Sequence, residues 1–243
     1  MRNSIMYRTL FSGALLLALV SPALGQDEMP VSGTDGTTSV DLAFITHLDA
    51  DLPEQDVFIE RVEGSGEVFR VTKGDHNMGA PLFAAAEMIE HDPANPDAVG
   101  PHPKGRSLGM TLGEWLKHQG TGTYTCTDGA GSLDVSFTGL VPNGVYTMWH
   151  AFVVMPHNPK TGILELPLGE RDGSDAAFTA DADGNASFVR NFKPCLQMSD
   201  TWTTAMLALN YHSDGETYGA YAGQFGIYAH IPLFLILPNR EGI

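Results

Sequence analysis

The sequence has 243 residues, of which 29 are aspartate or glutamate and 13 are lysine or arginine. Its hydrophobic content of 43% is typical of a chain that folds around a core and argues against disorder. Because an acidic surface repels phosphate groups, the net charge of −16 argues against nucleic acid as a partner.

The first 25 residues have the layout of a secretory signal peptide. Arg2 and Arg8 precede an apolar run at residues 13–20, and small residues follow up to Gly25. The run is too short to span a bilayer of about 30 Å, so we expect cleavage rather than a membrane anchor. Removal leaves 11 basic and 29 acidic residues, a net charge of −18. No later segment is long enough to be transmembrane, and the sequence predicts an exported protein, periplasmic or extracellular.

Residues 26–105 are expected to form an N-terminal extension. Alternating apolar residues predict short strands at 39–44 and 67–72. An alanine-rich apolar run with a proline at its head favours a short helix over 81–89. Four prolines within residues 91–103 indicate an irregular connection after it.

Residues 106–238 are expected to form the main domain. Thr111 and Glu114 have the spacing of a capping box, which predicts a second short helix. Beyond it, turn residues separate short runs that alternate or are wholly apolar. The expected strands lie at 123–126, 133–138, 145–155, 176–179, 186–189, 203–211 and 227–237, with a hairpin turn at 181–185.

This pattern predicts a mainly β chain whose main domain is an antiparallel β-sandwich of Greek-key or jelly-roll type. One or two short helices are expected in the N-terminal half. No period of helical length lies between the predicted strands.

Cys126 and Cys195 are the two cysteines of the sequence. In an exported protein, such a pair is expected to form a disulfide rather than a catalytic thiol or half of a metal site. The bridge closes a long loop, which contributes about 4 kcal/mol in the chain-entropy model. The rival use, a copper site with Cys195 and Met198, lacks a histidine next to Cys195.

Three histidines lie within or at the end of predicted strands: His150, His212 and His230. Sheet pairing could bring them together, and three imidazoles can hold zinc or copper and leave one position open for water or substrate. The alternative is that each histidine is hydrogen-bonded independently among aromatic neighbours. Strand alternation places His150 on the same face as Met148 and Phe152.

Two carboxylates, Asp214 and Glu216, follow His212 directly. Either could orient an imidazole, ligate a cation or act as a general acid or base. The alternative is a plain turn, because Asp-Gly is a turn dipeptide.

Residues 135–146, which lead to His150, resemble the strand-turn-strand unit of copper/zinc superoxide dismutases and of the related exported CHRD-type domains. Those enzymes carry a His-x-His pair on the second strand, and here Met148 stands in the place of one of the two histidines. The resemblance therefore implies a Greek-key sandwich but does not imply dismutase activity.

The sequence thus predicts an exported β-sandwich that binds a metal ion, copper or zinc, or a small polar ligand near His150, His212 and His230. Two other classes stay open. One is a metal-dependent enzyme that uses the same three histidines, with Asp214 or Glu216 as the acid or base. The other is a structural or surface-interaction protein without a site.

Overall fold

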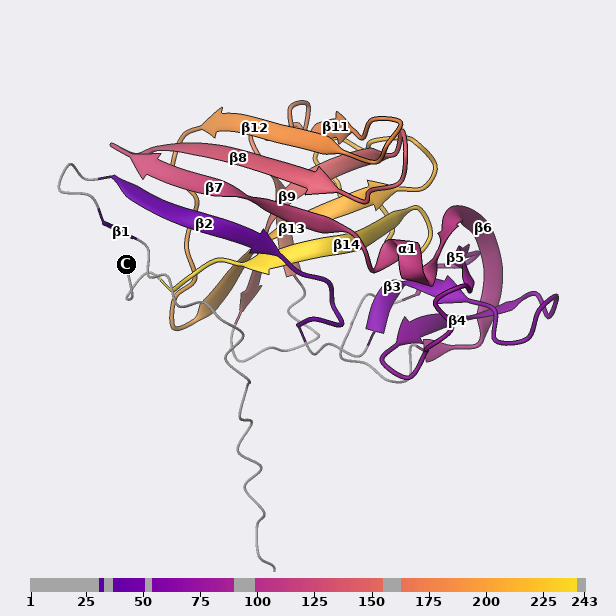
Figure 1. The fold of residues 1–243 in the computed structure, drawn as a ribbon. Coiled ribbons are helices and arrows are strands. Elements are labelled where there is room, and N and C mark those ends of the chain that lie inside the picture. Colours follow the sequence, from indigo (N-terminus) through magenta and orange to yellow (C-terminus); the bar gives the residue numbers. More distant parts are fainter. Residues whose placement is uncertain (1–30, 33–36, 51–53, 90–98, 155–162, 240–243) are drawn as a thin grey trace, which may run out of the picture.

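The computed structural model describes residues 31–32, 37–50, 54–89, 99–154 and 163–239. The predicted signal peptide, residues 1–25, lies outside them. Two antiparallel sheets pack face to face, and a small closed barrel lies at one end (Figure 1). The prediction of a mainly β chain with an antiparallel sandwich is confirmed. Within these ranges, no helix has the length and the apolar character needed to pass through a bilayer.

The first sheet has the strand order β1-β2-β7-β8-β12, and all of its neighbouring pairs are antiparallel. Its second strand lies within the range predicted as an N-terminal extension, yet it pairs with β7 along its whole length. The strands are β1 (Val31–Ser32), β2 (Thr38–Phe44), β7 (Gln119–Thr127), β8 (Ala130–Thr138) and β12 (Ala186–Phe192).

The second sheet has the order β10-β9-β13-β14, and β11 also pairs with β9. β9 is almost wholly apolar and lies inside this sheet, with neighbours on both sides. The strands are β9 (Val145–Val154), β10 (Ile163–Pro167), β11 (Ala177–Thr179), β13 (Thr203–His212) and β14 (Ala229–Ile236).

The core lies between the two sheets and follows the alternation of their strands. Leu133 and Phe137 of β8 are buried against Tyr146 and Met148 of β9. Gly120 of β7 leaves room for the ring of Phe137, its partner on β8, because a side-chain carbon at this position would lie 2.6 Å from that ring.

The small barrel has the strand order β3-β4-β6-β5 and lies between β2 and β7 in the sequence. The predicted boundary between residues 105 and 106 falls inside its last strand. The strands are β3 (Glu54–Ile59), β4 (Glu67–Thr72), β5 (Pro81–Ala85) and β6 (His102–Thr111).

The helix predicted over 81–89 is wrong, because Pro81–Ala85 form strand β5. This strand pairs with both β3 and β6, and Leu82 and Ala84 are buried in the core. Pairing on both sides outweighs the helical propensity of the alanines. Proline is the first residue of the strand, a position that a sheet tolerates.

The second predicted helix is present as α1 (Leu112–Trp115), at the junction between the barrel and the sandwich (Figure 1). Thr111 caps it, as the sequence indicates. The backbone N–H of Thr111 donates to the Glu114 carboxylate at 2.7 Å, and the backbone N–H of Glu114 donates to the Thr111 hydroxyl at 3.4 Å.

The turn at residues 181–185 does not close the predicted hairpin. β11 pairs with β9 in the second sheet, whereas β12 pairs with β8 in the first. The turn therefore carries the chain from one sheet to the other, and the chain also crosses between β8 and β9 and between β12 and β13. Such crossings are usual in Greek-key sandwiches.

Candidate functional site

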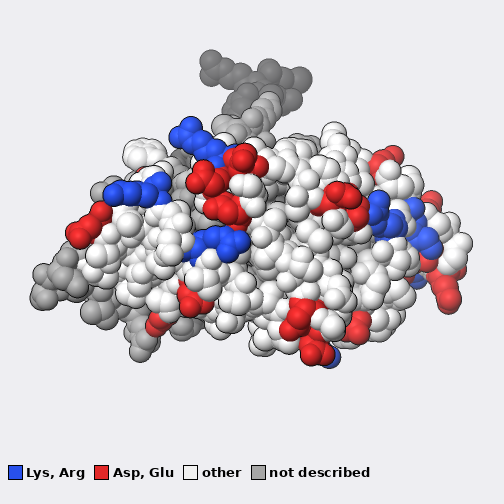
Figure 2. All heavy atoms as spheres, turned by 90° about the horizontal axis from the view of Figure 1, so that it is seen from above, with Lys and Arg blue, Asp and Glu red and all other residues white. Residues whose placement is uncertain are grey.

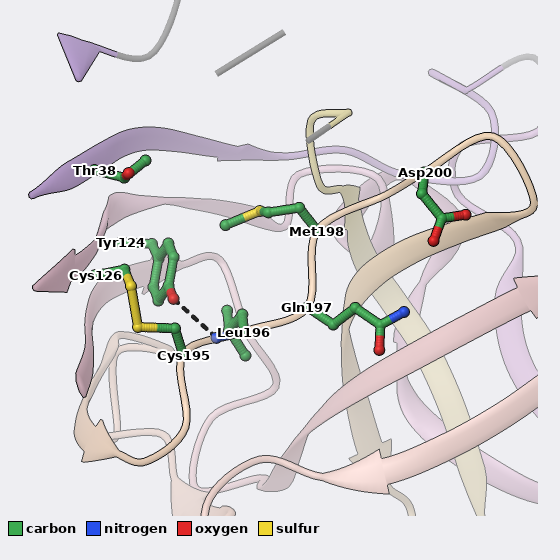
Figure 3. Close-up of a pocket in the computed structure, with 8 residues that line it drawn as sticks. All are labelled: Thr38, Tyr124, Cys126, Cys195, Leu196, Gln197, Met198 and Asp200. Atoms are coloured by element: carbon green, nitrogen blue, oxygen red, sulfur yellow. Dashed lines mark hydrogen bonds between the residues drawn. A yellow bond between two sulfur atoms is a disulfide. The ribbon is translucent and has the colours of Figure 1, made fainter. Parts of the chain in front are cut away.

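The predicted disulfide between Cys126 and Cys195 is present and ties β7 to the loop after β12. A hydrogen bond supports the same contact: the hydroxyl of Tyr124, also on β7, accepts the backbone N–H of Leu196 at 2.8 Å (Figure 3). We call residues 195–197 the 195–197 segment. Its first two residues are thus fixed to the first sheet.

His150 fixes the other end of the 195–197 segment to the second sheet. Nε2 of His150 lies 3.0 Å from the carbonyl oxygen of Gln197 and donates to it, because a carbonyl oxygen can only accept. Burial lowers the pKa of His150 to about 4 although this carbonyl acts in the opposite direction. The ring is therefore neutral at pH 7, and Nδ1 is its acceptor nitrogen.

A cleft of about 800 Å³ opens where the 195–197 segment faces the second sheet. We call it the Cys195 cleft. Its size is typical of small-molecule sites. The apolar part of its lining includes Phe152, Leu166, Pro167, Phe192 and Leu196. The polar part consists of His150, Glu170, Arg171, Asp175, Asn191, Lys193 and Gln197.

The loop after β10 forms one rim of the Cys195 cleft. Asp175 shapes this loop, because its carboxylate accepts the backbone N–H of Glu170 at 2.7 Å. Gly169 makes the approach feasible: its φ is +108°, and a side-chain carbon there would lie 2.4 Å from the Asp175 carboxylate. One of the two acidic side chains in the cleft thus has a structural role within the rim.

Arg171, in the loop after β10, and Lys193, in the loop after β12, give the cleft two cationic side chains. Such groups are scarce in a sequence with 13 basic and 29 acidic residues. On the face seen from above, lysine and arginine are few, and acidic groups lie scattered over a largely uncharged surface (Figure 2).

A second hollow of about 580 Å³ also borders the 195–197 segment (Figure 3). Thr38, Tyr124, Met198 and Asp200 line it together with the segment itself. The disulfide-bonded segment therefore lines both hollows. Its position decides the shape of both.

His212 lies on β13 and has a different environment. Its Nε2 is 2.7 Å from the hydroxyl oxygen of Thr147, which also accepts the indole N–H of Trp149 at 2.7 Å. Burial lowers the pKa of His212, whereas the charge of Asp214 acts to raise it. The ring thus belongs to a buried polar group on the outer face of the second sheet.

His230, on β14, uses both of its ring nitrogens. Nδ1 donates to the backbone carbonyl of Asp56 at 2.7 Å, and Nε2 lies 3.0 Å from the hydroxyl of Ser213. Burial lowers the pKa of His230 to about 4 and keeps the ring neutral. The histidine therefore links the sandwich to strand β3 of the barrel.

The structure does not bring His150, His212 and His230 into one site. Across β9 and β13, His150 pairs with Leu207 and His212 with Val145. The two histidines are five strand positions apart, about 17 Å, and alternation places them on opposite faces of the sheet. His230 pairs with Tyr211, the neighbour of His212, which places it on the opposite face from His212, although His212 is near enough for its charge to help lower the pKa of His230.

No group of three or more His, Cys, Asp and Glu side chains that could hold a metal ion occurs in the described parts of the chain. The independent, hydrogen-bonded state of the histidines is thus the arrangement that the contacts support. Each ring makes different hydrogen bonds: His150 with a carbonyl oxygen, His212 with a hydroxyl, and His230 with one of each.

Asp214 and Glu216 lie in a turn after β13, in which Gly215 N–H donates to the carbonyl of His212 at 3.1 Å. Asp214 accepts the backbone N–H of Glu216 at 3.2 Å and the hydroxyl of Tyr218. Its carboxylate therefore shapes the turn and holds a tyrosine. Glu216 is exposed.

His150 and the cysteine pair could be identified from the sequence, whereas most of the polar lining of the Cys195 cleft could not. Arg171 and Lys193 lie in irregular segments after strands, where no local pattern marks them. The one feature of the sequence that could have drawn attention to these two residues is the scarcity of basic residues in an acidic chain. Only the three-dimensional structure shows that Arg171 and Lys193 line the same cleft.

Acidification should destabilise the fold between about pH 6.5 and pH 4. Burial lowers the pKa of His118, His150 and His230 to about 4, below the ordinary 6.5. In this range the unfolded chain binds more protons than the folded chain, so stability falls as the pH falls. Urea unfolding as a function of pH measures this loss.

The variant His230→Asn keeps a donor for the Asp56 carbonyl and removes the titrating ring. We expect the slope of unfolding free energy against pH to decrease by up to about 1.4 kcal/mol per pH unit. His76→Asn is the matched control, because His76 is exposed. An unchanged slope in His230→Asn contradicts the assignment of the slope to His230.

The fold and the cleft define an antiparallel β-sandwich protein with a disulfide-framed cleft beside its second sheet. No protein-family model, curated protein or solved structure matches the chain. Its function is therefore argued from the residues of the site.

Proposed function

We propose that the chain is an exported binding module of the β-sandwich class and that it holds a small polar ligand in the Cys195 cleft. The observation that carries the proposal is the lining of this cleft, where charged side chains of both signs and two amides lie beside an apolar wall. Clefts of this size with a few convergent polar groups are the usual form of small-molecule sites.

Export is supported by the disulfide, because such bonds persist in oxidising compartments. It is also supported by the layout of residues 1–25. The disulfide has a second use in this proposal. It holds one wall of the cleft in place before the ligand arrives, which reduces the entropy lost on binding.

The test uses three small probes with different charges: acetate, inorganic phosphate and glycine. Each is titrated into the isotope-labelled mature chain, and amide shifts are followed by NMR. We expect shifts concentrated at residues 166–171 and 191–197 for at least one probe. Shifts spread over the barrel instead, or none with any probe, contradict the proposal.

Variants then separate binding in the cleft from general attraction to charge. Arg171→Gln or Lys193→Gln removes one charged donor, which should weaken binding of an anionic probe about tenfold. Lys117→Gln is the control, because Lys117 is exposed and lies after α1, outside the cleft lining. Equal weakening in all three variants points to nonspecific attraction.

Copper or zinc binding by His150, His212 or His230 stays a prediction, and the same sample tests it. Titration with Cu²⁺ and with Zn²⁺, against the His150→Ala and His212→Ala variants, reports whether these rings contribute. Affinity that both variants leave unchanged removes the histidines as metal ligands.

A further inference from the structure

A strip of exposed and partly exposed apolar side chains lies on β9 and on the edge strand β10 of the second sheet. Val154, Leu164 and Leu166 are 52%, 59% and 47% exposed. Pairing of β9 with β10 places Leu164 opposite Phe152 and Leu166 opposite His150. Alternation puts all of these side chains on one face of the sheet, and of them His150, Phe152 and Leu166 line the Cys195 cleft. We call Phe152, Val154, Leu164 and Leu166 the apolar strip.

The apolar strip is unusual for its exposure rather than for its composition. Scattered single apolar residues are normal on a protein surface, whereas a contiguous set beside a cleft marks a binding surface. The inner faces of a sandwich normally bury such residues against the opposite sheet. Here the strip continues the core outward into the cleft, since Phe152 packs against the buried cluster.

Cationic groups lie next to this strip. Arg171 and Lys193 line the same cleft as Phe152 and Leu166. The lining also holds two carboxylates, Glu170 and Asp175, and that of Asp175 accepts the backbone N–H of Glu170 within the rim loop. The Debye length is about 8 Å in physiological salt, so a group bound beside Arg171 and Lys193 is influenced more by the charges of the lining than by the acidic groups elsewhere on the surface.

We propose that the Cys195 cleft binds an amphiphilic anion, a molecule with a carboxylate, sulfate or phosphate head and an unbranched alkyl tail of medium length. The head lies between Arg171 and Lys193, and the tail lies along the apolar strip. This inference rests on the proposed function and narrows the ligand to one chemical class. The carboxylate, sulfate and phosphate heads share the chemistry that the two cations recognise.

The first experiment measures the dependence of affinity on tail length. Butanoate, hexanoate, octanoate and decanoate are titrated calorimetrically into the mature, oxidised chain below their micelle concentrations. Each buried methylene is expected to tighten binding about fourfold until the tail covers the strip. Decyltrimethylammonium has an alkyl tail one carbon longer than that of decanoate and the opposite charge, and we expect it to bind more weakly in spite of the longer tail.

Matched variants assign the two ends of the ligand. Leu164→Gln and Leu166→Gln should reduce the gain per methylene, whereas Val62→Gln should not, although Val62 is 69% exposed on the barrel. Arg171→Gln with Lys193→Gln should weaken all four carboxylates by a similar factor, and Lys117→Gln should leave them unchanged. The substituted side chains are exposed or line the cleft, and a melting curve of each variant verifies its fold.

The outcomes separate this inference from the proposed function. If butanoate and decanoate bind equally and both depend on Arg171 and Lys193, the cleft takes small polar anions and the amphiphile is overturned. If decyltrimethylammonium binds as tightly as decanoate, the assignment of the head group is overturned. If no carboxylate binds and the three small probes also fail, the proposed function falls together with this inference.

Discussion

Replacing Arg70 by methionine is expected to lower the free energy of unfolding by about 3 to 5 kcal/mol. Arg70 on β4 and Asp56 on β3 form a buried ion pair at 3.2 Å, and both side chains are 2% exposed. The substitution takes the guanidinium away from a carboxylate that stays in the interior. Urea unfolding of the oxidised chain measures the loss.

A double variant controls for the volume of the side chains. Arg70→Met combined with Asp56→Leu removes both charges, and well-packed apolar residues often replace a buried ion pair without a net cost. We therefore expect the double variant to be more stable than Arg70→Met alone. A single variant that loses less than about 1 kcal/mol contradicts the prediction, because that is the range of an exposed ion pair.

Removal of the disulfide should cost about 4 kcal/mol of unfolding free energy in the chain-entropy model. The bridge joins residues 69 positions apart, so the unfolded chain without it gains considerable freedom. The variant Cys126→Ala with Cys195→Ala is compared with the oxidised wild type by urea unfolding. The same loss is expected when the wild type is reduced.

The double cysteine variant supplies the control, because a reducing agent has no disulfide left to cleave in it and should not alter its midpoint. A second readout is ligand affinity. Cys195 lines both hollows, so loss of the bridge should weaken binding in the Cys195 cleft. Equal urea midpoints for the oxidised wild type and the variant contradict an energetic role of the bridge.

Most of the longer strands of the sandwich could be predicted because their burial follows local patterns. The run that contains Leu133, Val135 and Phe137 alternates in sequence and in burial. The capping box of Thr111 and Glu114 likewise contains its whole signal in four consecutive residues. Such features depend on neighbours in the chain, which a sequence displays directly.

Strand partners and register could not be predicted in the same way. The alanine-rich run after Pro81 has the composition of a helix and becomes a strand because two other strands pair with it. The turn at residues 181–185 has the composition of a hairpin and connects different sheets. Tertiary pairing decides both cases, and no local pattern records it.

The candidate site shows the same division. The pairing of Cys126 with Cys195 follows from the count of cysteines and from the expected compartment. Whether three histidines meet depends on register, and a difference of five positions between His150 and His212 separates them. Strand β10 with its exposed leucines was not among the predicted strands, and apolar residues in the core and at a binding surface look alike in a sequence.

The place of the barrel between β2 and β7 has a consequence for how the molecule is assembled. Phe44 at the end of β2 pairs directly with Gly120 near the start of β7. The barrel and α1 are thus topologically an insertion in what is otherwise a single β-hairpin of the first sheet. The inserted segment begins after Phe44 and ends before Gly120, two residues that are paired in the first sheet, so the pairing of β2 with β7 does not depend on the length of the insertion. Contacts such as the hydrogen bond between His230 and the Asp56 carbonyl then hold the barrel against the sandwich.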